Sequence, residues 1–554
     1  MISNNFFWFL LPLLVFSQTS APTNATPVLR RTNQTIRWVD CHERLPDLTA
    51  EELNITSPTF PGTLPSNLHC GEMDVPMDYA KPFNAITNNI TIGFAMLRPA
   101  KPASGLIFYH AGGPGNNAAA EVWANALNSS TSFTGLENFD ILAVNVRGIQ
   151  FSNPLNLTTG VFFNNVSFPF PSTQDEFDQY TAALKNFYDA AIRDSTPPGI
   201  TQHIGTTEVI QDWDSMRAAL GYEKVSMAAV SYGTLTGMSY ASKYPERVDR
   251  FVLDAALPHG APLQEFVTTQ VAAVNRLVQR VDAFCQTDPT CPFYGQGNGS
   301  VLQAWDTVLA RSIQAPLPAL SCGPGTSCIS PVTPSDLRQA ANVLLVSNPD
   351  FPLFSIGLNA SLNGDASIFA YSPESDIRES VGGPLFCADF AIDDDIKTFA
   401  GFNNLSVNAN SSDPLQIIYT VNWQALLQCT VWPFSVDTSI ARVALPTDLP
   451  IMWMTSDFDL NLPTELTTFA FQQTPKSTPE EQRPTGLYCT VPPPAAAAGD
   501  LARDFLRTGI MPGPSSNVAV TVIGPGGIPR PIPGAYDVPT GAAAGDMSIV
   551  GNIM

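Results

Sequence analysis

The stretch VSMAAVSYGTLTGMSYASKYPERV, residues 225–248, decides how this chain folds. An apolar segment of strand length ends at Val230 and runs directly into Ser231, after which the residues suit a helix. A serine at so tight a strand-to-helix turn needs small neighbours two positions before and after it, because the backbone folds back on itself there. Ala229 and Gly233 meet that need, with alanine in place of the first glycine of the G-x-S-x-G pattern. The stretch therefore favours a nucleophilic Ser231 over an ordinary buried serine at a helix start.

A glycine-rich turn upstream supplies the second half of the predicted site. The strand-like segment GLIFY ends in HAGGPG, residues 110–115. Consecutive glycines let backbone N–H groups point into a cleft, where a developing oxyanion needs donors at about 2.7–3.1 Å. We therefore predict an oxyanion hole formed by Gly112 and Gly113 with the backbone amide of Tyr232, rather than a plain glycine-rich turn. His110 is expected to orient this loop.

Apolar segments of strand length recur along the chain and alternate with helical stretches. They read ITIGFAML, GLIFYH, FDILAVNV, VSMAAV, RFVLDAAL and LPIMWMT, at residues 90–97, 105–110, 139–146, 225–230, 250–257 and 449–455. Strands this uniformly apolar belong in a parallel sheet that helices cover on both faces. The predicted class is α/β, with a mostly parallel sheet.

The strand pattern stops between residues 258 and 440, where apolar residues recur at three-and-four spacing and cysteines appear. This stretch is most simply a mainly helical lid inserted between two halves of one sheet. The expected organisation is a signal peptide at 1–21, an extended N-terminal segment at 22–83, core at 84–257, the lid at 258–440, core again at 441–512, and a Gly/Pro/Ala-rich tail at 513–554. Within the tail only a strand at 518–523 is expected.

The composition excludes several classes of partner. The chain of 554 residues has 27 basic and 49 acidic side chains, so its net charge is −22, and its hydrophobic fraction of 44% is ample for a large core. No basic patch is available to release counterions from phosphates, which argues against nucleic acid and anionic membrane surfaces as partners.

The first residues have the features of a secretory leader. An apolar run from Phe6 to Phe16 is followed by small and polar residues that suit cleavage after Ala21, and the run is too short to span a bilayer. Glycosylation sequons agree with export, although a chain rich in Asn, Ser and Thr makes some by chance. The sequons are Asn24, Asn33, Asn54, Asn89, Asn128, Asn156, Asn165, Asn298, Asn359, Asn404 and Asn410. We predict a secreted, extracellular protein with N-glycans and no membrane anchor.

The cysteines fit an oxidising compartment. Close spacing predicts the disulfides Cys285–Cys291 and Cys322–Cys328, and elimination then gives Cys41–Cys70 and Cys387–Cys429. Cys489 is left over. Tight cysteine doublets with neighbouring histidines are absent from the sequence, so neither a metal nor a cofactor is predicted.

The chain resembles the secreted α/β-hydrolase peptidases of the prolyl iminopeptidase and tripeptidyl aminopeptidase type. Besides the serine turn, the matching blocks are HAGGPG (110–115), FDILAVNVRGIQFSNP (139–154), TTEVIQDWDSMRAALG (206–221) and LPIMWMTSDFDLNLPT (449–464). The resemblance extends from Cys70 to about Pro512 and implies an α/β-hydrolase fold. Asn145 stands where the family usually has an aspartate, a change we interpret as structural.

The resemblance also implies the remaining members of a catalytic triad. The family's acid is an aspartate with a proline four positions later, which Asp459 and Pro463 match, although Asp457 is a near neighbour. The family's histidine should follow roughly thirty residues on, but no histidine follows His259, and the alignment places Tyr488 at that position. A real substitution and an error in the gene sequence would each explain this.

A missing base has a large consequence. A serine hydroxyl is a poor nucleophile until a base takes its proton, and a tyrosine with a pKa near 10 is a poor base at neutral pH. Weak or absent hydrolysis is therefore expected, and we interpret His259 as a loop residue rather than a substitute base. Three hypotheses follow: a serine aminopeptidase that takes peptide substrates and whose acidic lid residues bind their N-terminal ammonium, a catalytically inactive glycosylated binding protein, and an esterase or lactonase that takes small esters.

Overall fold

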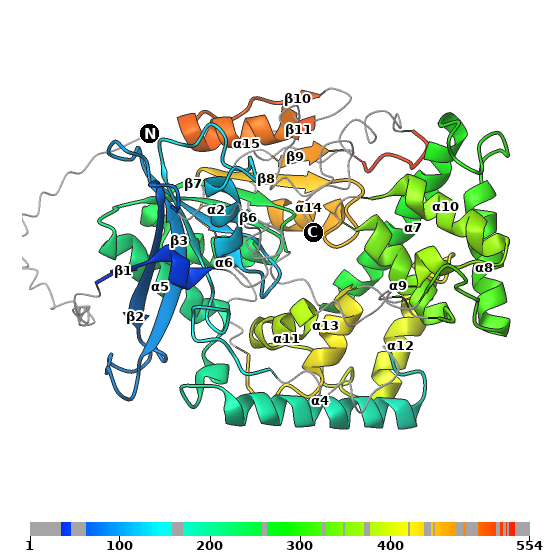
Figure 1. Cartoon of the computed structure of the whole chain (residues 1–554), viewed down its shortest axis with the longest axis horizontal. Helices are drawn as coiled ribbons and strands as arrows, with labels where there is room; N and C mark the ends of the chain where they lie inside the picture. Colours follow the sequence, from blue (N-terminus) through cyan, green and yellow to red (C-terminus); the bar gives the residue numbers. More distant parts are fainter. Residues whose placement is uncertain are drawn as a thin grey trace, which may run out of the picture. The chain divides into compact units, whose positions relative to one another are not determined.

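The computed structural model describes residues 35–45, 63–157, 170–257, 263–323, 328, 330–346, 349–370, 377–418, 421–436, 445–446, 449–472, 480–483, 497–516, 521–523, 528 and 531–537. Their strands form one sheet of eleven, in the order β1-β2-β3-β5-β4-β6-β7-β8-β9-β11-β10 (Figure 1). The strands are β1 Arg37–Val39, β2 Leu68–Val75, β3 Ile90–Leu97, β4 Leu106–His110, β5 Asp140–Val144, β6 Val225–Val230, β7 Val248–Asp254, β8 Ile451–Ser456, β9 Glu480–Arg483, β10 Ser515–Ser516 and β11 Thr521–Ile523.

The central strands β5, β4, β6, β7, β8 and β9 run parallel, and antiparallel strands flank them on both sides. The apolar segments of the sequence supply β3 to β8, and β4 and β5 are buried throughout. Such burial is what a parallel sheet covered on both faces requires. The predicted α/β class with a mostly parallel sheet is therefore confirmed.

Strand β4 lies between β5 and β6, so the chain changes direction across the sheet at this point. In open α/β sheets, ligands bind beyond the carboxyl ends of the strands at such a switch point. The HAGGPG loop leaves the end of β4 and Ser231 leaves the end of β6. The topology thus brings the two predicted halves of the site together.

Helices pack around the sheet and fill the stretch between β7 and β8. Those outside that stretch are α2 Ala118–Ala126, α4 Gln174–Asp194, α5 Thr206–Ala219, α6 Tyr232–Lys243, α14 Thr464–Gln472 and α15 Ala497–Thr508. Those within it are α7 Leu263–Thr287, α8 Ser300–Gln314, α9 Pro334–Leu345, α10 Phe351–Leu362, α11 Ile377–Asp389, α12 Phe399–Ala409 and α13 Val421–Cys429. We call the described residues of 263–436 the helical segment; Figure 1 shows α11 and α13 lying side by side within it.

Four disulfides join the cysteines as the spacing and elimination predicted. They are Cys41–Cys70, Cys285–Cys291, Cys322–Cys328 and Cys387–Cys429. The last one connects α11 to α13 and so fixes one helix of the helical segment on another. Cys489 lies outside the described residues.

Besides the short strands β1 and β10, strands β2 and β9 form where the sequence patterns did not indicate them. Strand β2 belongs to the part expected to be merely extended, and its polar residues alternate with buried ones. Strand β9 has the sequence EEQR within a polar, Pro-rich stretch, yet it pairs with β8 and β11. Strand β2 buries alternate apolar residues while it pairs with β1 and β3, and β9 is paired on both sides.

No helix among the described residues is long and apolar enough to cross a lipid bilayer. The proposed leader, residues 1–21, lies outside the described residues, as do Asn24, Asn33, Asn54 and Asn165. Of the remaining sequons, Asn89 is half-buried and the others are exposed: Asn128, Asn156, Asn298, Asn359, Asn404 and Asn410.

Candidate active site

Ser231 lies at a sharp turn between β6 and α6. Its backbone has φ 53° and ψ −127°, a positive φ that is rare for a residue with a side chain. The Ser231 N–H donates to the Asp254 carbonyl oxygen at 2.9 Å, which fixes the turn against the end of β7. Ser231 is half-buried, whereas the following ten residues of α6 are buried. A strained backbone of this kind persists only where the surroundings hold it, and such residues concentrate at functional sites.

The small residues around the turn have steric reasons to be small. A Cβ atom on Gly233 would lie 2.8 Å from the His110 ring, and one on Gly112 would lie 2.9 Å from Ser231 Cβ. Gly112 also has φ +86°, so a side chain there would be strained as well as crowded. The glycine-rich loop after β4 therefore packs directly against the serine turn.

His110 holds that loop through a hydrogen bond. Its buried ring accepts a hydrogen bond from the Gly112 N–H at Nδ1, over 3.1 Å. Burial lowers the pKa of His110 to about 4, so the imidazole is neutral at physiological pH. Because the Gly112 amide is occupied by His110, the amides of Gly113 and Tyr232 are the two of the three predicted oxyanion donors that this contact leaves for the role. Tyr232 is the first residue of α6, where helical N–H groups have no partner within the helix.

Asp459 lies in the loop that follows β8, at the same edge of the sheet. Val230 pairs with Asp254, and Asp254 pairs with Met454, so the carboxyl ends of β6, β7 and β8 are aligned. Asp459 is buried, and its Oδ1 accepts the N–H groups of Asn461 at 2.8 Å and Leu462 at 3.0 Å.

The loop around Asp459 is embedded in the helical segment. Phe458 and Leu460 belong to the hydrophobic cluster formed mainly by α7 to α10. The Asn461 carbonyl oxygen accepts a hydrogen bond from Gln270 of α7 at 2.6 Å. Asp457 is also buried, so burial does not separate the two aspartates as candidate acids.

The catalytic base is predicted from the sequence alone. Tyr488 and His259 both lie outside the described residues. Among the described residues, none is hydrogen-bonded to Ser231 Oγ, and His110 Nδ1 accepts the Gly112 N–H instead.

A buried carboxylate that the sequence patterns did not single out touches the residue after the serine. The Tyr232 hydroxyl donates to Asp389 Oδ2, as does Thr206 Oγ1 at 2.6 Å, and the Thr206 N–H donates to Asp389 Oδ1 at 2.8 Å. Burial raises the pKa of Asp389 from its usual 3.8 to about 6. A lone aspartate in the apolar stretch PLFCADF was the available signal.

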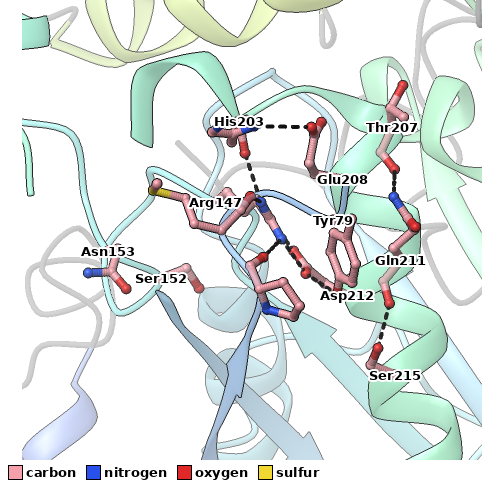
Figure 2. A network of polar contacts seen from close by, with 12 residues as sticks. Tyr79, Arg147, Ser152, Asn153, His203, Thr207, Glu208, Gln211, Asp212 and Ser215 are labelled. Atoms are coloured by element: carbon pink, nitrogen blue, oxygen red, sulfur yellow. Dashed lines mark hydrogen bonds and ion pairs between the residues drawn. The ribbon is translucent and has the colours of Figure 1, made fainter. Parts of the chain in front are cut away.

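A second buried network fixes the loops that follow β2 and β5, as Figure 2 shows. Arg147 is fully buried and binds Asp212 of α5 through Nε at 2.6 Å and Nη2 at 2.8 Å. The same guanidinium donates to the backbone carbonyls of Pro76, Met77 and His203.

Both residues of this ion pair lie in sequence blocks that matched the family, although no role could be read from the sequence. Nearby, the Asn145 side chain accepts the Ala119 N–H at the start of α2 over 3.3 Å, a structural contact.

The sheet topology and the comparison with known proteins indicate the same class of fold. A family model described as alpha/beta hydrolase fold matches residues 105–323, from the start of β4 into the helical segment. The chain has the α/β-hydrolase fold.

Curated relatives narrow this class. The tripeptidyl aminopeptidase of Streptomyces coelicolor is 26% identical over 205 residues, which are 35% of this chain and 36% of that protein. The serine protease Hip1 of Mycobacterium bovis is 25% identical over 266 residues, which are 47% of this chain and 46% of that protein. The chain thus spans less than half the length of these relatives. The matches support an α/β hydrolase of the peptidase type.

Proposed function

We propose that this protein is a secreted serine hydrolase of the aminopeptidase type, which releases N-terminal residues or short peptides through an acyl-enzyme. The observation that carries the proposal is the positive-φ turn at Ser231, held at the carboxyl end of β6 and in contact with the loop at Gly112. This arrangement exposes a hydroxyl beside backbone amides, which acyl transfer requires.

In the proposed reaction, Ser231 Oγ adds to the substrate carbonyl and its proton passes to the base. The oxyanion receives hydrogen bonds from the amides of Gly113 and Tyr232, with Gly112 holding the loop through His110. Collapse of the adduct breaks the scissile bond, the base returns the proton to the leaving amine, and water then hydrolyses the ester on Ser231. Asp459 is the acid that would orient an imidazole.

Tyr488 occupies the position of the base in this proposal, so hydrolysis is impaired. The placement is supported by the pairing of Arg483, the end of β9, with Ser456, the end of β8. The connection that contains Tyr488 therefore begins at the edge of the sheet where Ser231 and Asp459 lie. Without an imidazole, catalysis rests on substrate binding and the oxyanion donors alone, about 10³- to 10⁴-fold over water.

The helical segment is proposed to be the lid over this site, and export and glycosylation are proposed with it. The embedding of Phe458 and Leu460 in the segment's core supports its closeness to the acid loop. Four disulfides and the exposure of six sequon asparagines support an extracellular, glycosylated protein.

A fluorophosphonate probe tests the central claim. Slow labelling that disappears in Ser231→Ala, and accelerates in Tyr488→His, is the expected result. Hydrolysis of aminoacyl and tripeptidyl amides, compared with short-chain esters, then separates an aminopeptidase from an esterase.

Two outcomes would contradict the proposal in different ways. Labelling of wild type at the full rate of a serine hydrolase, abolished by His259→Ala, would show that the base is not missing. No labelling in either wild type or Tyr488→His would favour the inactive binding protein, the second candidate, which the lack of any histidine after His259 supports.

A further inference from the structure

Helix α11 of the helical segment contacts both halves of the candidate oxyanion hole. Near the middle of the helix, a Cβ atom on Gly382 would lie 2.8 Å from the carbonyl oxygen of Pro114, the residue after Gly113. At its last residue, Asp389 accepts a hydrogen bond from the hydroxyl of Tyr232. Tyr232 thus contacts α11 directly, and Gly113 is adjacent in the chain to Pro114, which contacts the same helix. These are the two residues proposed to supply amides to the oxyanion.

The carboxyl group of Asp389 is buried, and both of its oxygens accept hydrogen bonds. Its Oδ2 accepts hydrogen bonds from the hydroxyls of Tyr232 and Thr206, and its Oδ1 accepts one from the N–H of Thr206, the first residue of α5. Gly205 leaves room for this approach, since a Cβ there would lie 3.1 Å from Asp389 Oδ1. A buried carboxyl group that loses one of these partners leaves a polar group unsatisfied, so the junction resists displacement.

The opposite side of α11 is held just as closely. Cys387 is bonded to Cys429 of α13, and Gly383 lies against the side chain of Gln428. The Tyr188 hydroxyl of α4 donates to the Gln428 carbonyl oxygen at 3.1 Å. The helix therefore has little freedom to move away from the oxyanion loop without disturbing α13 and α4.

We propose that Asp389 is a positioning residue, through which α11 sets the distance between the two oxyanion donors, the amides of Gly113 and Tyr232. The inference rests on the proposed function for the role of those amides, and it adds a task for the lid beyond covering the substrate. Donors must lie at about 2.7–3.1 Å from the oxyanion, so a small shift of either half costs rate. Asp389 fixes the Tyr232 half, and the close approach at Gly382 fixes the Gly113 half.

Hydrogen–deuterium exchange, read by mass spectrometry on peptide fragments, tests this inference without any need for activity. Asp389→Asn places an amide N–H₂ where hydroxyl donors converge, so exchange should rise about tenfold in residues 205–209 and 231–236, the change in local opening that one lost buried hydrogen bond brings. Gly382→Ala should instead raise exchange in residues 110–116.

Matched variants within the helical segment control for general loosening. Gly323→Ala adds the same methyl group where nothing lies within 4 Å, and Asp365→Asn removes an aspartate that bonds Ser321 and Ser367 away from α11. Neither should change exchange in 110–116 or 231–236. If Asp389→Asn does not fold, Tyr232→Phe removes the same hydrogen bond from the other partner and should raise exchange in 231–236 alone. Unchanged exchange at the turn in both variants, or equal changes in the controls, would overturn the inference.

A kinetic comparison in the Tyr488→His background separates a positioning role from a structural one. Adding Asp389→Asn should lower kcat about tenfold and leave KM within about twofold, because oxyanion hydrogen bonds act mainly in the transition state. A rise in KM with unchanged kcat would contradict the role. If Tyr488→His has no activity, the proposed function fails, but the exchange experiment still decides whether α11 holds the two halves.

Discussion

Strands β6 and β9 lie in the same parallel part of the sheet, yet they are built in different ways. Strand β6 reads VSMAAV and is almost wholly buried between β4 and β7, whereas β9 reads EEQR and pairs with β8 and β11. At the end of β6, close packing fixes the turn of Ser231 against Gly112. Tyr488, which we propose for the position of the base, follows β9 in the sequence, where the family that the chain resembles has a histidine. Close packing around Ser231 thus restricts the residue types that the nucleophile half can hold, whereas Tyr488 lies outside the described residues.

The largest expected effect on the rate of hydrolysis comes from placing an imidazole at residue 488, in the segment that follows β9. Tyr488→His should raise hydrolysis of aminoacyl amides by up to about 10⁴-fold, since general base catalysis contributes about 10² to 10⁴. The measurement is kcat/KM, with the rate of fluorophosphonate labelling alongside it. Tyr488→Phe is the matched control and should leave the wild-type rate unchanged, because the phenol hydroxyl is not a useful base at neutral pH. A gain in Tyr488→Phe equal to that in Tyr488→His would break the comparison.

The acid should matter only when an imidazole is present. In the Tyr488→His background, Asp459→Asn should lower kcat on the order of 10³-fold, because the amide cannot stabilise the imidazolium that forms. In the wild-type background the same change should lower the rate less than about threefold, because residues that act as a unit are not additive. Asp457→Asn is the comparator. A larger loss from Asp457→Asn than from Asp459→Asn would reassign the acid.

The buried ion pair of Arg147 and Asp212 tests how far the nucleophile region at the end of β6 depends on the stability of the fold around it. Arg147→Met leaves Asp212 buried without its cation and should lower the free energy of unfolding by about 3–5 kcal/mol, measured by urea denaturation. Arg311→Met, which removes an exposed guanidinium bonded to the Leu362 carbonyl, should change it by less than about 0.5 kcal/mol. A loss for Arg147→Met no larger than this control would mean that the network does not stabilise the loops.

The same contrast explains what the sequence could predict. The apolar runs and the small residues around Ser231 indicated the class of fold and the serine turn, because buried strands and crowded turns restrict residue type directly. Strand β2 escaped prediction because His69, Glu72 and Asp74 interrupt its apolar residues, and β9 because its sequence EEQR has no apolar residue.

The contacts of Arg147 with Asp212 and of Asp389 with Tyr232 could not be predicted for a different reason. Each joins residues far apart in the chain, and a single sequence does not show which buried charges meet. The occupation of the Gly112 amide by His110 likewise depends on the orientation of a ring, which the motif HAGGPG does not specify.

The smallest predicted effect concerns pH and again compares the two regions, because Asp389 lies on the nucleophile side. Its pKa of about 6, against 3.8 when exposed, means that the folded protein binds this proton more tightly than the unfolded chain. The stabilisation is therefore complete below about pH 4 and is lost as the pH rises through 6, by at most about 3 kcal/mol at 1.36 kcal/mol per pKa unit. Glu208, whose charge contributes to the raised pKa, lies beside His203 on the α5 side of this carboxyl group.

A comparison of wild type with Asp389→Asn isolates this group from others that titrate in the same range. His110 acts in the opposite sense, because its lowered pKa costs stability as the pH falls from 6.5 towards 4. Since His110 is present in both proteins, its contribution cancels in the difference. Urea unfolding at pH 4.5 and 7 should show wild type losing stability relative to Asp389→Asn as the pH rises, with no further change above pH 7. A difference that stays constant across this range would mean that Asp389 does not bind its proton more tightly in the folded protein, and that its contacts with Tyr232 and Thr206 already compensate for the burial of its charge.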